Sequence, residues 1–163
     1  MYKTLLYAPF YVRATTLRRK LAKAIDGEIE RGCKHFVIGG EIGVFNKLCL
    51  QYCRYVRDHY YPLEITLVVP DAKTAMDFDG NGIYLYRDVN VLIYHDDEEK
   101  QMVDDCDAFI CNVDEDEEVY EDYLNMIKRA RAQNKRVLNI FPTPEEENAP
   151  PDYNKPYEFG RKY

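Results

Sequence analysis

The chain has 163 residues, of which 46% are apolar, 13% aromatic and 31% charged. This is the composition of one globular domain; it excludes a disordered or fibrous protein, and no apolar run approaches the roughly 20 residues that span a bilayer. The net charge of -7 hides a segregation, because residues 96–122 carry fourteen carboxylates against one lysine and residues 1–60 carry eleven Lys and Arg against five Asp and Glu. The acidic segment disfavours extended nucleic acid as a partner, whereas the basic half suits a small phosphate-bearing molecule.

The N-terminus lacks the apolar core and cleavage site of a secretory signal, so we expect a cytoplasmic protein with no membrane association. The five cysteines lie mostly in apolar stretches and predict buried free thiols; they are Cys33, Cys49, Cys53, Cys106 and Cys111. Cys49 and Cys53 share one face of a predicted helix. Because no second Cys or His pair stands at zinc spacing, the pattern favours core packing, and we predict no metal and no cofactor.

Predicted strands and helices alternate along the chain. Six short apolar runs predict strands at residues 4–8, 35–40, 63–70, 89–94, 107–113 and 135–142. Apolar residues at helical spacing predict helices at residues 17–29 and 42–60, a short acidic helix through Met102 and Val103, and a helix at 117–134. Thr15 or Thr16 is expected to cap the first helix, and Asn134 is expected to end the last one.

This alternation is typical of parallel crossover units. It predicts one α/β domain over residues 1–141, with a Rossmann-like, doubly wound, mostly parallel sheet of about six strands and helices on both faces. Residues 142–163, rich in proline and glutamate, are expected to form an irregular tail. Ligands of such folds bind beyond the carboxyl ends of the strands, where we expect the functional surface.

The most informative segment is HFVIGGEIGVFNKLC at residues 35–49. A strand that runs through Gly39, Gly40 and Gly43 into a helix leaves backbone N–H groups unobstructed at the helix N-terminus, where the dipole favours an anion. The motif matches neither the GxGxxG fingerprint nor the Walker lysine and serine. It therefore predicts a phosphate-binding turn, and the alternative is that the glycines only make a tight connection.

The order of the segments, together with GGEIGVFNKLC and MVDDCDAFICNV, resembles the SLOG superfamily, in particular its YpsA-like branch, over most of residues 3–141. The resemblance implies that the glycine turn binds a nucleotide or nucleotide-derived ligand, with the three glycines at the phosphate and Arg13 adding charge. The ends of the first and fifth predicted strands extend this site. The expected ligand-binding residues are Ala8, Pro9, Arg13, Gly39, Gly40, Glu41, Gly43 and Asn112.

The acidic sequence DEDEEVYED stands where the hydrolases of this superfamily have a second glycine motif, PGGxGTxxE. We therefore expect a noncatalytic, regulatory binder with no catalytic residue. One alternative is an N-glycosidic bond enzyme, either a nucleoside monophosphate phosphoribohydrolase or a relative of the nucleoside deoxyribosyltransferases. The sequence YAPF at residues 7–10 resembles the opening of these transferases. In the transferase case Glu118 or Glu121 would be the nucleophile. Another alternative is a protein-interaction module without a ligand, and homo-oligomerisation is left open.

The segment DFDGNGIYLYRD at residues 77–88 imitates the first half of a calcium loop, with Asp77, Asp79 and Asn81 at the expected offsets. Its twelfth position is Asp88 instead of a bidentate glutamate. We therefore predict a glycine-rich turn here and no calcium site.

Overall fold

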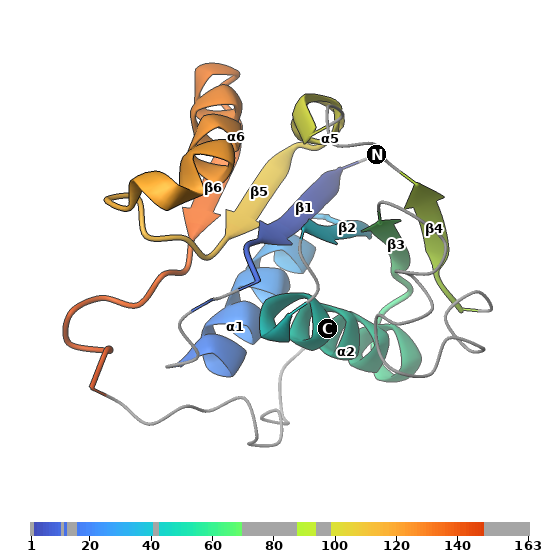
Figure 1. Cartoon of the computed structure of the whole chain (residues 1–163). Helices are drawn as coiled ribbons and strands as arrows, with labels where there is room; N and C mark the ends of the chain where they lie inside the picture. The colour runs from blue at the N-terminus through green and yellow to red at the C-terminus, as the bar shows by residue number, and fades with distance from the viewer. Residues whose placement is uncertain are drawn as a thin grey trace.

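A six-stranded sheet forms the centre of the domain (Figure 1). The computed structural model describes residues 2–10, 12, 16–40, 43–69, 88–93 and 99–148. The strands are β1 (Lys3–Ala8), β2 (His35–Gly40), β3 (Glu64–Val69), β4 (Asn90–Ile93), β5 (Ala108–Cys111) and β6 (Arg136–Asn139). Their order across the sheet is β4-β3-β2-β1-β5-β6, and every neighbouring pair is parallel. The predicted open, Rossmann-like α/β fold is thereby confirmed.

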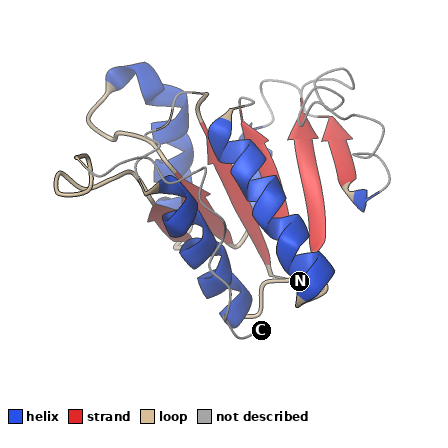
Figure 2. Cartoon of the chain, turned by 90° about the horizontal axis from the view of Figure 1, so that it is seen from below, coloured by secondary structure: helices blue, strands red, loops and turns tan. Residues whose placement is uncertain are grey.

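Helices cover both faces of the sheet, as predicted. They are α1 (Leu17–Glu30), α2 (Val44–His59), α5 (Glu99–Asp105) and α6 (Glu121–Ala132), and a short 3-10 helix, η2 (Glu118–Tyr120), precedes α6. In Figure 1, α1 and α2 lie below the sheet and α5 and α6 lie above it. Figure 2 shows the strands side by side with helices laid across them. No described helix is both long and apolar enough to cross a membrane.

The sheet separates two hydrophobic cores, and β1 contributes to both. Leu6 and Ala8 pack into the core on the α1 and α2 side, whereas Leu5 and Tyr7 pack into the core on the α5 and α6 side. Successive side chains of a strand point to opposite faces, so a central strand covered on both sides is apolar at most positions. This explains why the strand runs of the sequence are continuous rather than alternating.

Two residues expected at helix ends, Asn134 and Thr16, are found there. Asn134, just after α6, has φ 58°, the left-handed conformation that commonly ends a helix. Thr16 is the N-cap of α1, but its side chain makes no capping bond; its hydroxyl instead donates to Glu146 Oε2 at 3.2 Å. Glu146 also accepts from Lys20 Nζ at 2.9 Å, so the segment after β6 is fastened to the beginning of α1.

All five cysteines are free and buried, as predicted. Burial raises the pKa of the Cys106 thiol to about 12 and raises those of Cys49, Cys53 and Cys111 well above their ordinary values. These thiols are therefore protonated at neutral pH and act as small apolar core residues.

Candidate functional site

The strand order reverses between β1 and β5. From β1 the chain proceeds outward through β2, β3 and β4, and it then returns to place β5 on the other side of β1. The connection after β1 leads to α1 below the sheet, and the one after β5 leads to α6 above it (Figure 1). Connections that diverge in this way open a crevice at the carboxyl ends of the two strands, the usual ligand site of open α/β sheets.

A cavity of about 320 Å³ lies at this reversal point. Its lining comes from the segments that follow β1, β5 and β6 and from η2. The described lining residues are Val12, Asn112, Val113, Asp114, Glu117, Val119, Tyr120 and Phe141. The volume is within the range of small-molecule sites, about 300–1,000 Å³.

Asn112 is the polar group at the inner side of this cavity. Asn112 is 1% exposed, and neither its amide nitrogen nor its amide oxygen has a hydrogen-bond partner within the described part of the chain. A buried amide without partners costs about 1–3 kcal/mol. Both amide atoms are covered by the protein, and Asn112 thus borders the cavity with a donor group and an acceptor that have no partner among the described residues. This is the property expected of a ligand-recognition residue.

Asn139, at the end of β6, holds the loop after β5 in place. Its side chain donates to the Val113 carbonyl at 2.8 Å and accepts from the Val113 N–H at 3.2 Å and the Phe141 N–H at 3.1 Å. Its Nδ2 also donates to Glu115, which accepts a hydrogen bond from Arg131 at 3.0 Å. The hydrogen bond from Arg131 lowers the pKa of Glu115, with a smaller contribution from Asn139. The position of Asn112 is thus set by contacts made without a ligand.

The described lining of the cavity is negatively charged. Asp114 and Glu117 line it, and the described lining residues include no lysine or arginine. The Asp114 side chain accepts the Asp116 N–H at 3.0 Å, and its carbonyl accepts the Glu117 N–H at 3.2 Å, which gives a tight turn. This environment favours hydroxyl, amide or cationic groups and disfavours a phosphate.

The glycine turn lies on the other side of β1. Gly43 is the N-cap of α2, and Asn46 connects both ends of the turn: its Nδ2 donates to the Gly39 carbonyl, and its Oδ1 accepts the Gly43 N–H at 3.2 Å. Asn46 is completely buried. The junction between β2 and α2 is therefore fastened by one side chain that the sequence reading did not single out.

Two of the glycines are required by packing. A Cβ on Gly39 would lie 2.9 Å from the Tyr7 ring, and a Cβ on Gly43 would lie 2.7 Å from the Phe10 carbonyl oxygen. Both distances are too short for ordinary contact, so a larger residue at position 39 would displace the Tyr7 ring of β1, and one at position 43 would displace the segment after β1. The glycines bring the loop after β1 and the beginning of α2 together, whether or not a phosphate binds there.

Several expected site residues come together at the end of β1. Gly40 pairs with Ala8 in the β1–β2 register, and the β1–β5 register, which pairs Leu6 with Ile110, brings Asn112 level with Ala8 when extended by two residues. Pro9 follows directly. Gly40, Ala8 and Asn112 therefore stand in a row across three adjacent strands, about 10 Å from end to end at the usual strand spacing. Glu41 and Arg13 lie outside the described residues.

The carboxylates that reach the cavity are not the ones named as possible nucleophiles. Glu118 and Glu121 are exposed and are not among its described lining residues, whereas Asp114 and Glu117 are. The signal for Asn112 was present in the sequence as a polar residue directly after the buried run AFIC. Its lack of partners, however, depends on neighbours far away along the chain.

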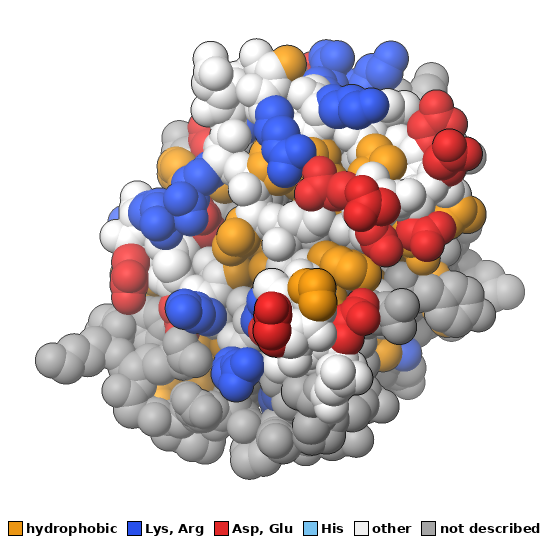
Figure 3. All heavy atoms as spheres, turned by 90° about the vertical axis from the view of Figure 1, so that its left-hand side faces the viewer, with side chains coloured by type: hydrophobic (Ala, Val, Ile, Leu, Met, Phe, Trp, Pro, Cys, Tyr) orange, Lys and Arg blue, Asp and Glu red, His pale blue; other side chains and the backbone are white. Residues whose placement is uncertain are grey.

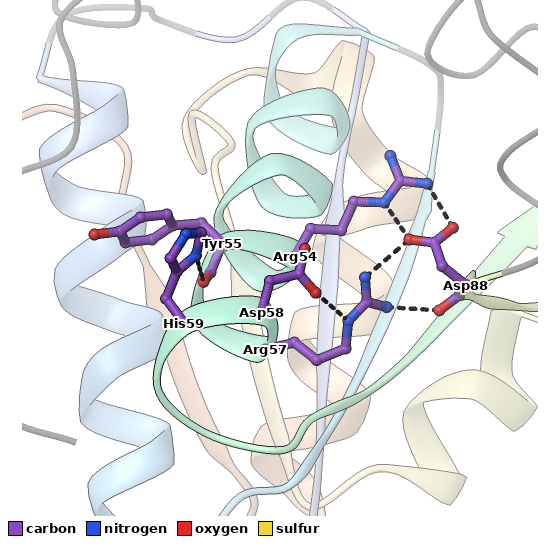
Figure 4. Close-up of polar contacts among 6 residues, drawn as sticks. All are labelled: Arg54, Tyr55, Arg57, Asp58, His59 and Asp88. Carbon is purple, nitrogen blue, oxygen red and sulfur yellow. Dashed lines mark hydrogen bonds and ion pairs between the residues drawn. The ribbon is translucent and has the colours of Figure 1, made fainter.

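The segment that imitates a calcium loop is described only at its last position. Asp88 lies next to β4 and accepts from Arg54 Nε at 2.7 Å and from Arg57 Nη2 at 2.9 Å; Arg57 also donates to its carbonyl at 2.6 Å (Figure 4). Residues 77–87 lie outside the described part. Asp88 thus connects α2 with the edge strand β4. Within the described residues, no three His, Cys, Asp or Glu side chains are grouped so that they could hold a metal ion.

No family model matches the chain, and searches among curated proteins and solved structures gave no match either.

Proposed function

We propose that this protein binds a nucleotide-derived ligand across the ends of β2, β1 and β5. The uncharged part of the ligand, base or sugar, lies in the cavity against Asn112, and its phosphate lies at the beginning of α2. The observation that carries the proposal is the buried, unpartnered amide of Asn112 at the point where the strand order reverses.

The charges of the cavity and of the α2 N-terminus determine which part of the ligand lies at each. Asp114 and Glu117 repel a phosphate from the cavity but accept hydrogen bonds from sugar hydroxyls or base N–H groups. The N-terminus of α2 favours an anion through its dipole and its first N–H groups. Gly40 and Asn112 are separated by two strand spacings, about 10 Å, and a nucleoside monophosphate spans this distance.

The experiment is calorimetric titration of the protein with a nucleoside monophosphate panel, the matching nucleosides and ribose 5-phosphate. We expect Asn112→Leu to weaken binding of nucleosides and nucleotides at least about tenfold, which corresponds to about 1.4 kcal/mol. Gly40→Asp, which puts a negative charge at the phosphate position, weakens only the phosphorylated compounds. Asn125→Leu, at an exposed position on α6, is the matched control and leaves the affinities unchanged. If no compound of the panel binds the unmodified protein at millimolar concentration, the proposal fails.

A second candidate function is cleavage of an N-glycosidic bond, favoured by the two carboxylates that line the cavity. A carboxylate beside the sugar stabilises the oxocarbenium-like transition state of such a reaction. The test is chromatographic detection of free base from nucleosides and nucleoside monophosphates. Base release that Glu117→Gln or Asp114→Asn abolishes establishes this activity, and the absence of release from every bound compound leaves binding alone.

A further inference from the structure

A second hollow, of about 590 Å³, lies between α1 and the edge strand β6. Its apolar floor is formed by Ala24 of α1 together with Leu138 and Ile140 near β6. Ile140 belongs to the core below the sheet, whereas Leu138 is 37% exposed although it is a large apolar side chain at the sheet edge. The α1–β6 groove therefore exposes apolar surface that the described chain leaves uncovered.

The rim of the α1–β6 groove is basic. Arg19, Lys20, Lys23 and Arg31 contribute from α1, and Arg136 contributes from β6. The one carboxylate among the described lining residues is Glu146, which pairs with Lys20. The buried Glu28 beneath the rim accepts from Arg136 Nε at 2.8 Å. Counting both carboxylates, the cations remain in excess, so an acidic partner is favoured.

Gly27, on the floor of the groove, has no packing role within the described chain. A Cβ there would meet only the tip of the flexible Arg31 side chain, at 3.1 Å. Glycine inside a helix costs about 0.5–1 kcal/mol relative to alanine. The Arg31 side chain lies over this stretch and donates from Nη1 to the Gly27 carbonyl at 2.8 Å, so a polypeptide that approaches the helix here has to displace only one flexible side chain.

The segment that complements this groove is present in the same chain. Val119 is 79% exposed and is surrounded in sequence by Glu117, Glu118, Glu121 and Asp122. The 117–122 segment thus presents an apolar side chain surrounded by carboxylates. It complements the α1–β6 groove, in which an apolar floor is surrounded by cations. Figure 3, which looks at the side of the molecule that carries β6 and α6, shows apolar side chains exposed among charged side chains of both signs.

We propose that a second copy of this chain docks its 117–122 segment, with Val119 at the centre, into the α1–β6 groove. Each copy carries both surfaces, so the contact produces a homo-oligomer, the possibility that the sequence left open. Val119 enters the apolar floor over Gly27, and the carboxylates of Glu118, Glu121 and Asp122 face the basic rim. Since the 117–122 segment also borders the ligand cavity, assembly places the neighbouring copy beside that cavity. The proposal stands independently of which ligand the cavity binds.

Sedimentation velocity over a concentration series up to about 0.2 mM tests the contact, because association follows mass action. We expect the unmodified protein to associate at about 50 mM salt and to dissociate at about 500 mM, where exposed charges are screened. Lys23→Glu in the groove and Val119→Lys at the tip each weaken association at least tenfold. Both positions are exposed, so the fold is retained, and circular dichroism checks this. Lys47→Glu, an exposed lysine of α2, is the matched control and associates normally.

The decisive measurement mixes the two defective variants. Lys23→Glu retains an intact tip and Val119→Lys retains an intact groove, so the mixture forms heterodimers although each variant alone is monomeric. Gly27→Ala raises the melting temperature and weakens association, because the methyl group stabilises the helix but fills the groove floor. A protein that stays monomeric throughout the series overturns the proposal, as does association that neither variant affects.

Discussion

Two buried asparagines at the same edge of the sheet have opposite surroundings. Asn46 follows β2 at the glycine turn, is completely buried, and uses both ends of its amide to join Gly39 with Gly43. Asn112 follows β5, is almost as deeply buried, and finds no partner for either end in the described chain. The first amide completes the fold, whereas the second is the group that we propose for ligand recognition.

This difference changes where the recognition residue of the site is sought. The glycine turn attracts attention in the sequence, but Asn46 and the packing of Gly39 and Gly43 explain much of it as structure. The loop after β5 has no glycine, yet it carries the unsatisfied group and borders the cavity. Buried polar groups without partners are rare in folded proteins, so they indicate function more specifically than a glycine-rich connection does.

The largest expected effect is that of Asn46→Leu. The substitution keeps the volume but leaves the buried Gly39 carbonyl and the Gly43 N–H without their partner, so we expect a loss of about 2–4 kcal/mol in the free energy of unfolding. Urea unfolding followed by circular dichroism measures it. A loss below about 1 kcal/mol contradicts the structural role given to Asn46.

Gly43→Ala comes next. Its Cβ would lie 2.7 Å from the Phe10 carbonyl oxygen, so the loop after β1 must move, and we expect a loss of about 1–3 kcal/mol. The same urea experiment applies. Gly27→Ala is the control for the effect of the methyl group itself, since no backbone atom obstructs a Cβ there, and it should stabilise the protein. Equal shifts in the two variants would remove the steric explanation.

Asn112→Leu is expected to act in the opposite direction to Asn46→Leu. Replacing an unpaired buried amide with an apolar side chain of similar volume removes its desolvation cost, so the free energy of unfolding should rise by about 1 kcal/mol. Ligand binding should weaken at least about tenfold in the same variant. A marked destabilisation would show that the amide of Asn112 has a partner in the free protein, and the contrast with Asn46 would disappear.

The smallest expected change in the free energy of unfolding is that of a substitution at Asp88, away from both asparagines. It measures how much a partly exposed ion pair contributes to stability. Burial raises the pKa of Asp88, but hydrogen bonds from Arg54 and Arg57 outweigh it, so the pKa lies below its ordinary 3.8. A lowered folded-state pKa stabilises the protein above pH 3.8, and the stabilisation is lost as the pH falls through the folded-state value.

Asp88→Asn should therefore cost about 0.5–1 kcal/mol at neutral pH, since solvent screens the partly exposed pair. The difference from the unmodified protein should vanish in acid. Thermal unfolding across a pH series measures it, and a difference that persists unchanged in acid would contradict the assignment of the effect to the ionised carboxylate.

The strands, the helices and their layers could be predicted because the local pattern determines them. A run such as TLLYA, in which only Thr4 is not apolar, suits a strand covered on both faces. The apolar spacing of Leu17, Leu21 and Ile25 suits one face of a helix. Asn134 at the end of α6 follows from the left-handed backbone that asparagine tolerates. These features depend on residues within one or two turns of each other, which the sequence displays directly.

The sequence by itself thus determined the α/β class and the buried state of the five cysteines, and it indicated the edge of the sheet at which we propose a ligand site. Only the tertiary structure decided that β1 and β5 are the strands between which the order reverses, and that Asn46 is paired while Asn112 is not. The physical reason is that hydrogen-bond satisfaction depends on which atoms are close in space. The cavity around Asn112 is formed by segments from Val12 to Phe141, and no local pattern records their meeting.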